Sequence, residues 1–313
     1  MSTFRELLQA SFKSADTEEW LDVHFTRPIG LAFALLWNKF GIHPNVITIL
    51  SIFLGVGAGY MFYYTDLWHN VCGVLLLMFA NFCDSTDGQM ARLTGKKTLI
   101  GRMLDGFAGD VWFFAIYLAI VLRLWNQTIP GTDYTWGIWG FLLCAVAGFL
   151  CHSNQSSLAD YYRQIHLYFL LGKEGSELDN YAQQRKIYED LPKSKWLDRL
   201  FYYNYANYCK GQEHRTPEFQ QFFKAVKTAW PNAEDMPQTL RQEFRAGGLP
   251  LMKFTNLLTF NTRAITLYVT CLLDCPWVYP LMEITVFHLM YAYMHRTHEQ
   301  LCRTMRENNI HRQ

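Results

Sequence analysis

Four aspartates lie close together in an otherwise apolar part of the chain. Asp84 and Asp87 follow one apolar run, and Asp105 and Asp110 stand at the start of the next, within DSTDGQMARLTGKKTLIGRMLDGFAGD. Residues three apart are neighbours on a helix, so Asp84 and Asp87 would share one helix face. Carboxylates at membrane depth cost free energy, and they therefore usually face a cavity and serve a function.

Carboxylates that converge in this way need a counter-charge. Four of them cannot stay ionised side by side, because their mutual repulsion would hold protons on some of them. Mg²⁺ or Mn²⁺ removes that repulsion, since both prefer hard oxygen ligands. Gly88 would let the backbone approach a ligand, and Arg92 would offer a forked donor to a phosphate. The alternative is that the aspartates only mark the inner ends of two membrane helices, with the basic residues as ordinary positive-inside charges.

The elements that must position these carboxylates are apolar stretches of nearly membrane-spanning length. The chain is 50% hydrophobic and 18% charged, which excludes a disordered chain. Stretches of about 20 mostly apolar residues predict an all-α polytopic membrane protein with six transmembrane helices. They run over 46–65, 68–83, 104–124, 136–153, 255–274 and 276–294. In the first, Gly55, Gly57 and Gly59 would permit close helix packing.

Lys and Arg positions predict the orientation of these helices. With the N-terminus in the cytoplasm, the outer connections are 65–68, 126–135 and 274–276, and none contains Lys or Arg. Basic residues on the inner side are the usual bias of membrane proteins. We therefore expect both termini in the cytoplasm, in an inner or plasma membrane, with the site facing the cytoplasm. The N-terminus lacks the apolar core of a secretory signal.

Four regions follow from this pattern. Residues 1–44 form a cytoplasmic N-terminus, in which 28–42 would be an interfacial helix or, alternatively, a buried core helix. Residues 45–153 hold the first four transmembrane helices and the acidic motif. Residues 154–254 form a helical cytoplasmic insertion, with one helix capped by Thr216 and its tyrosines at 202–208 forming a small core. Residues 255–313 hold the last two transmembrane helices and a cytoplasmic tail.

The charge balance argues against one class of partner. With 28 Lys and Arg against 27 Asp and Glu, the formal net charge is +1, and no global field would attract a phosphate backbone. We expect no nucleic-acid partner. The sequence leaves open whether two copies pair as a homodimer.

The acidic stretch resembles the signature of the CDP-alcohol phosphotransferase (CDP-alcohol phosphatidyltransferase) family, D-x2-D-G-x2-A-R-x8-G-x3-D-x3-D. Seven of its fixed positions match with the correct spacing: Asp84, Asp87, Gly88, Ala91, Arg92, Gly101 and Asp105. The resemblance covers roughly 20–155 and, more loosely, 255–295, including HPNVIT at 43–48 before the first apolar stretch. It implies a membrane enzyme that transfers a phospho-alcohol from a CDP-linked donor to a hydroxyl and releases CMP.

The resemblance also implies roles for residues. Two Mg²⁺ or Mn²⁺ ions would be held by Asp84, Asp87 and Asp105, and the CDP would lie beside Gly88, Ala91, Arg92 and Gly101. Asn45 would approach the donor, or alternatively would cap a helix next to Pro44. The family's last aspartate, a metal ligand and base, should stand at 109, where this chain has Gly109 followed by Asp110. Asp110 would reach the site if the turn at 106–109 is distorted, for instance by a π-bulge.

Two kinds of substrate pair occur in such a family. HFTRPI at 24–29 is similar to members that use CDP-inositol, which favours a CDP-headgroup donor, inositol-like, with diacylglycerol or ceramide as acceptor. The alternative is a CDP-diacylglycerol donor with a polar alcohol such as inositol phosphate. A non-catalytic transporter or inactive relative is the alternative of another class. Arg263 and Glu283 would suit a transport pathway, or would pair with each other.

Overall fold

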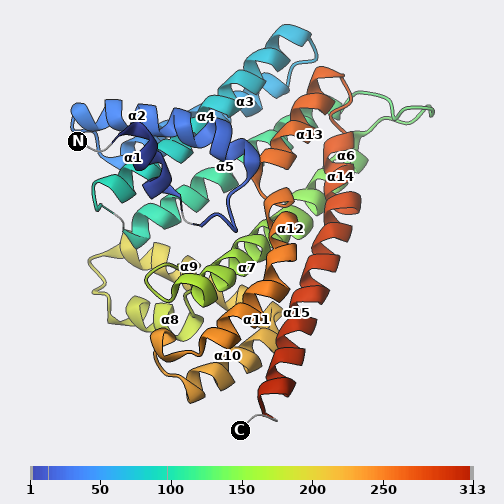
Figure 1. Cartoon of the computed structure of the whole chain (residues 1–313). Helices are drawn as coiled ribbons and strands as arrows, with labels where there is room; N and C mark the ends of the chain where they lie inside the picture. Colours follow the sequence, from blue (N-terminus) through green and yellow to red (C-terminus); the bar gives the residue numbers. More distant parts are fainter. Residues whose placement is uncertain (1–2, 13, 97, 311–313) are drawn as a thin grey trace. The chain divides into compact units, whose positions relative to one another are not determined.

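The chain forms two compact units of α-helix in the computed structural model (Figure 1). The structure describes residues 3–12, 14–96 and 98–310; the remaining terminal residues of the predicted cytoplasmic ends, 1–2 and 311–313, lie outside it. Within the described ranges the structure contains helices and no named strand, which confirms the all-α prediction. Unit 1 comprises Met1–Ser153 and Asn261–Val286, and unit 2 comprises Asn154–Phe260 and Phe287–Gln313.

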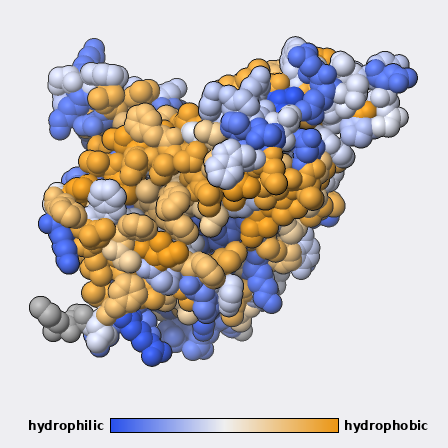
Figure 2. All heavy atoms as spheres, turned by 90° about the horizontal axis from the view of Figure 1, so that it is seen from above, coloured by the Kyte–Doolittle hydropathy of each residue, from blue (hydrophilic) through white to orange (hydrophobic). Residues whose placement is uncertain are grey.

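In the part of the chain that the structure describes, four helices are long and apolar enough to cross a membrane. They are Pro44–Phe62, Leu67–Leu93, Leu99–Leu124 and the continuous helix Gly137–Leu171. Large apolar side chains on them, such as Phe53 and Phe114, are exposed, as expected for surfaces that face lipid. Figure 2 shows apolar side chains over much of the face seen from above, with hydrophilic side chains along its margins.

The N-terminal segment of unit 1 places a short helix against the acidic motif. It contains α1 (Phe4–Ser11), η1 (Asp22–Thr26) and α2 (Arg27–Lys39). Thr3 and Glu6 form a capping box at the start of α1. α2 covers 28–39 of the predicted interfacial or core helix and packs against α4 (Leu67–Leu93), with its Ala34 buried beside Met90.

The acidic motif lies on α4 and α5 (Leu99–Leu124), and α3 (Pro44–Phe62) packs against both. α5 is capped by Thr98, whose side chain accepts a hydrogen bond from the Gly101 N–H. α3 packs closely on α5 at two glycines. A Cβ on Gly55 would lie 2.0 Å from Cδ1 of Trp112, and one on Gly59 would lie 2.9 Å from the backbone carbon of Ala115. The glycines predicted to permit close packing therefore do so at 55 and 59, whereas Gly57 has only ordinary contact distance to Leu76.

An arginine joins the far ends of these helices. The side chain of Arg123, near the end of α5, is buried and donates to the Phe62 carbonyl oxygen at 3.0 Å and to Asn70 Oδ1 at 2.8 Å. It also pairs with Asp274 Oδ1 at 2.6 Å. These bonds connect the ends of α3, α4 and α5 to the turn after α13 (Phe260–Leu272). Arg123 is thus a structural cation with several acceptors.

The rest of unit 1 comes from later in the chain, and two of its helices continue along the sequence into α7 and α15 of unit 2. α6 (Gly137–Ala145) continues through the π-helix η2 (Val146–His152) into α7 (Ser153–Leu171), and α14 (Val278–Met282) continues through the π-helix η5 (Glu283–Phe287) into α15 (His288–Ile310). The helix predicted over 255–274 is interrupted after Leu257, so α13 is only 13 residues long. That length is below what a spanning helix needs, and the six-helix count stays a prediction.

Unit 2 is built around an aromatic core. The ring centroids of Phe169 and Phe244 lie 3.9 Å apart, and Phe222 stacks on both. The tyrosines expected to form a core here do not all do so, since Tyr203 and Tyr208 are exposed. Thr216 precedes the first helical residue Pro217 as predicted, but its hydroxyl donates to the Gln212 carbonyl oxygen. The unit's helices besides α7 and α15 are α8 (Tyr181–Asp190), α9 (Trp196–Arg215), α10 (Pro217–Ala229), η3 (Ala233–Asp235), α11 (Gln238–Gly248), η4 (Leu249–Leu251) and α12 (Met252–Leu257).

Candidate active site

Three of the four predicted carboxylates meet between α4 and α5. The Asp84 side chain on α4 is within hydrogen-bond reach of Asp105 on α5, and Asp87 is close enough to both to interact electrostatically. Asp87 is only 4% exposed, and the other two are partly buried. Asp84 and Asp87 share a face of α4, as their spacing of three predicts, and the start of α5 supplies the third group.

A hydroxyl from α3 fixes the most buried of these carboxylates. Thr48 Oγ1 donates a hydrogen bond to Asp87 Oδ2, and Thr48 is itself 2% exposed. Thr48 stands one helical turn after Pro44, whose carbonyl oxygen lies 3.4 Å from the same hydroxyl. The three carboxylates and Thr48 therefore bring α3, α4 and α5 together at one point. The sequence motif HPNVIT contains Thr48, but only the packing of α3 on α4 reveals its partner.

The donor set suits a hard divalent cation. Two carboxyl groups at hydrogen-bond distance repel each other when both are ionised, and a cation between them removes the repulsion. Three carboxylates from two helices are the oxygen donors that Mg²⁺ and Mn²⁺ prefer. As the side chains stand, no group of three His, Cys, Asp or Glu residues in the described ranges is arranged to hold a metal ion. The carboxylates are chemically suited to the predicted ions, but their side chains would have to turn toward one another to bind a metal ion.

The predicted nucleotide-binding residues border this cluster. A Cβ on Gly101, in the first turn of α5, would lie 3.4 Å from Asn45 Oδ1, so the start of α3 faces the start of α5. The cap of α3 is His43, whose Nδ1 accepts from the Asn45 N–H at 3.3 Å. The capping alternative for Asn45 is therefore wrong, because His43 occupies that position.

The other predicted nucleotide-binding residues, Gly88, Ala91 and Arg92, lie on α4. A Cβ on Gly88 would lie 3.4 Å from Nη1 of Arg92, so the guanidinium folds over this glycine. Ala91 precedes Arg92 and is partly buried. A missing side chain at 88 leaves room for the arginine fork beside the carboxylates, which is the arrangement that a phosphate group needs.

Asp110 is directed elsewhere. α5 is a regular α-helix from Leu99 to Leu124, so the expected distortion of the turn at 106–109 is absent. Five residues along a regular helix correspond to about 140° of rotation, and Asp110 is exposed where Asp105 is partly buried. Asp110 lines a separate cavity between α5 and η2. Its role as ligand or base stays a prediction.

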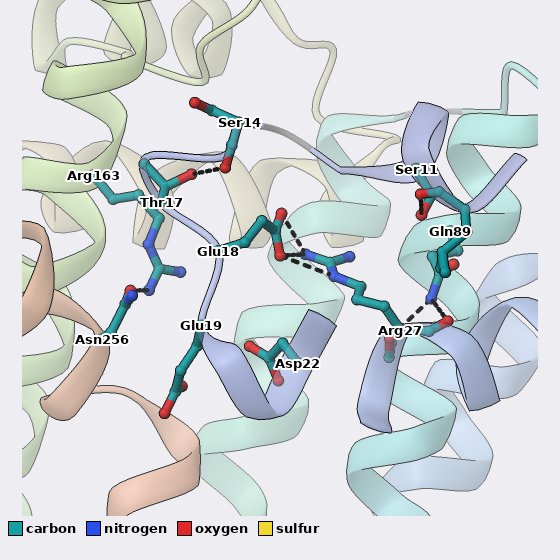
Figure 3. Close-up of polar contacts among 12 residues, drawn as sticks. Ser11, Ser14, Thr17, Glu18, Glu19, Asp22, Arg27, Gln89, Arg163 and Asn256 are labelled. Atoms are coloured by element: carbon teal, nitrogen blue, oxygen red, sulfur yellow. Dashed lines mark hydrogen bonds and ion pairs between the residues drawn. The ribbon is translucent and has the colours of Figure 1, made fainter. Parts of the chain in front are cut away.

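An arginine on α2 was not expected at this site. Arg27 Nη2 pairs with Glu18 Oε2 at 3.2 Å, and its charge acts on Asp84. Its backbone carbonyl oxygen accepts from Gln89 Nε2 of α4 at 3.0 Å (Figure 3). The sequence signal was present in HFTRPI at 24–29, but only the packing of α2 on α4 brings this cation to the acidic motif.

Two charged residues of the later helices pair inside unit 1. Arg263 Nη1 lies 2.5 Å from Glu283 Oε2, and both side chains are almost completely buried. Tyr279 donates to Glu283 Oε1 at 2.9 Å, and Arg263 Nη1 lies 2.9 Å from His152 Nδ1. The pairing alternative for Arg263 and Glu283 is therefore confirmed. A paired and buried ion pair needs no transport pathway to explain it.

Comparison with known proteins agrees with the resemblance seen in the motif. The family model described as CDP-alcohol phosphatidyltransferase matches residues 41–166. An uncharacterized protein of Aquifex aeolicus is 38% identical over 69 residues, which are 22% of this chain and 34% of that protein. An archaetidylinositol phosphate synthase of Pyrococcus horikoshii is 37% identical over 65 residues, 21% of this chain and 33% of that protein. The chain thus matches about a third of the length of each of these curated relatives.

Proposed function

Because residues 41–166 match the CDP-alcohol phosphatidyltransferase family, we propose that this protein is an integral membrane transferase of phospholipid or sphingolipid synthesis. It moves a phospho-alcohol group from a CDP-linked donor to a hydroxyl acceptor and releases CMP. The observation that carries the proposal is the meeting of Asp84, Asp87 and Asp105 between α4 and α5, inside the matched segment.

The three carboxylates hold the metal ions in this proposal. Asp84, Asp87 and Asp105 would hold two Mg²⁺ or Mn²⁺ ions, and Thr48 would orient Asp87 for this role. Such ions would supply positive charge to the donor's pyrophosphate during the displacement. Arg92, folded over Gly88, takes a phosphate of the donor, while Ala91, Gly101 and Asn45 border the nucleotide.

The reaction is an in-line displacement at phosphorus. The acceptor hydroxyl oxygen forms a bond to the donor's β-phosphorus as the bond from that phosphorus to the CMP oxygen breaks. The hydroxyl proton passes to a carboxylate of α5, for which Asp105 and Asp110 are the candidates. CMP leaves with the bonding electron pair, so the atoms and charges balance without a further reactant.

Two observations, a sequence similarity and the name of a relative, support the choice of substrate pair. HFTRPI at 24–29 favours a CDP-headgroup donor of inositol type with diacylglycerol or ceramide as acceptor. The name of the Pyrococcus horikoshii relative refers to a lipid that carries inositol phosphate, which also supports an inositol-type headgroup. That name does not say which substrate carries the CDP, so a CDP-diacylglycerol donor with inositol phosphate is the alternative.

The topology completes the proposal. Six spans with both termini inside put residues 154–254 and the three carboxylates on the cytoplasmic side of an inner or plasma membrane. α2 lies at the inner leaflet, where Arg27 and the start of α3 can meet a soluble nucleotide. The support is the absence of Lys and Arg from 65–68, 126–135 and 274–276.

CMP release by the purified protein tests the function. The protein is offered a panel of CDP-alcohols and CDP-diacylglycerol, each with diacylglycerol, ceramide or polar acceptors. We expect CMP only with one class of pair, with Mg²⁺ or Mn²⁺ present, and none after EDTA. Asp84→Asn, Asp87→Asn and Asp105→Asn should each lower turnover by orders of magnitude. Activity that survives EDTA would contradict the metal-dependent mechanism, and no CMP release with any pair would favour a transporter or an inactive relative.

A further inference from the structure

A cavity of about 380 Å³ lies inside unit 1, between α5 and the helix formed by α6 and η2. The two helices run in opposite directions, because Phe113 meets His152 whereas Leu124 meets Gly140. The cavity follows α5 from Asp110 to Val121. The eleven helical rises from Asp110 to Val121 amount to about 16 Å, close to the depth of one leaflet of a bilayer core of about 30 Å.

The two ends of this cavity differ in polarity. Asp110, His152 and Ser153 lie at the end nearer the three carboxylates, while Leu118, Val121 and Phe141 line the other end. Phe114, Leu118 and Phe149 at its rim are exposed apolar side chains. A cavity with an apolar rim on a membrane-spanning helix opens toward lipid, and its polar end then lies at the headgroup level.

His152 is held rigidly at the polar end. Its Nδ1 lies 2.9 Å from Arg263 Nη1 and 3.4 Å from Glu283 Oε1. The Phe113 ring packs on the imidazole with centroids 4.3 Å apart. His152 is also the last residue of a π-helix, a feature that often re-aims side chains at functional sites.

The charge of the lining selects the kind of lipid. Of the described residues that line the cavity, none is Lys or Arg, and Asp110 is acidic. A phosphate at the polar end would meet the Asp110 carboxylate, and the Arg263 guanidinium behind His152 is already paired with Glu283, which disfavours a nucleotide-linked lipid. A hydroxyl, in contrast, can donate to Asp110 and hydrogen-bond to His152.

We propose that this cavity binds a neutral lipid with a free hydroxyl, of the diacylglycerol or ceramide type. The aliphatic chain lies along α5 toward Val121, and the hydroxyl lies between Asp110 and His152. Asp110 is about 7.5 Å along α5 from Asp105, so the hydroxyl lies at the end of the cavity nearer the carboxylate cluster. This inference rests on the proposed function and deepens it, because it makes the lipid the acceptor and the CDP-linked compound the water-soluble donor.

Photolabelling tests the cavity without requiring turnover. The full-length protein in phosphatidylcholine nanodiscs is irradiated with a diacylglycerol that carries a diazirine in its acyl chain, and labelled peptides are identified by mass spectrometry. Parallel arms use the matching ceramide and CDP-diacylglycerol. Ala145→Phe, at the end of α6, fills the cavity, and Val146→Phe, at an exposed neighbouring position that does not line it, is the matched control.

We expect the neutral lipids to label residues 110–121 and 141–153, and Ala145→Phe to lower that labelling about tenfold. Val146→Phe should leave it unchanged. Labelling spread evenly over the lipid-facing helices, or unaffected by Ala145→Phe, would overturn the site. Stronger labelling by CDP-diacylglycerol than by diacylglycerol would overturn the choice of a neutral lipid. Loss of CMP release in every assay, with labelling intact, would count against the proposed function and not against the cavity.

Discussion

The hydroxyl of Thr48 on α3 donates a hydrogen bond to the carboxylate of Asp87 on α4, and both side chains are buried. This bond ties the helix that begins at the HPNVIT motif to the helix that carries two of the three clustered aspartates. An oriented carboxylate binds a cation more tightly than one that must first be fixed, because the ordering has already occurred.

Removal of the Thr48 hydroxyl should therefore weaken metal binding. Thr48→Val keeps the shape of the side chain and removes the donor, and we expect a loss of about 10- to 100-fold in metal affinity or activity. The measurement is CMP release titrated with Mg²⁺. Thr48→Ser, which keeps the hydroxyl, is the control and should recover most of the activity. Equal Mg²⁺ dependence in Thr48→Val and the wild type would contradict an orienting role.

Substitution of Asp105 and substitution of Asp110 should affect the Mg²⁺ requirement differently. Asp105 belongs to the carboxylate cluster, whereas Asp110 faces the cavity on another side of α5. Asp105→Asn should lower turnover by orders of magnitude and raise the Mg²⁺ requirement. Asp110→Asn should lower turnover without changing the Mg²⁺ requirement, because a base for the acceptor is lost and the ligands remain. A raised Mg²⁺ requirement in Asp110→Asn would instead make Asp110 a direct ligand.

The contact between α3 and α5 should not tolerate a methyl group. A Cβ on Gly55 would overlap the Trp112 ring, which is 2% exposed and has no room to move away. Gly55→Ala should destabilise the protein by about 1–3 kcal/mol through overpacking, seen as a lower Tm of the detergent-solubilised protein. Gly57→Ala is the matched control, since its nearest neighbour would be Leu76 Cδ1 at 3.6 Å. Equal Tm values for the two variants would refute close packing at Gly55.

The sequence predicted what depends on spacing along one helix or on composition. Asp84 and Asp87 are three residues apart and share a face, apolar stretches became helices, and Gly55 and Gly59 lie at close contacts. The shared face and the helices follow from local periodicity, and glycines in an apolar helix favour close contact whichever helix lies opposite.

What the sequence could not give depends on which helices pack together. Arg27 reaches the acidic motif only because α2 packs on α4, and His152 meets Arg263 and Glu283 only because η2, α13 and η5 converge. The break after Leu257 was also missed, although Asn256 and Asn261 weaken the apolar run there. The expected distortion at 106–109 was wrong, because α5 continues as a regular α-helix through Gly106 and Gly109.

Accessibility to a membrane-impermeant thiol reagent should reveal which side of the membrane carries unit 2. In a variant without accessible cysteines, Ser194→Cys lies in the exposed turn between α8 and α9 and should stay unlabelled in intact cells. Thr132→Cys, in the connection after α5 that lacks Lys and Arg, should be labelled from outside. Both sites should react once the membrane is permeabilised, because both are exposed to solvent. The bias of basic residues is the basis of the predicted orientation. The reverse labelling pattern would contradict that orientation and would place Asp84, Asp87 and Asp105 on the side of the membrane away from cytosolic nucleotide.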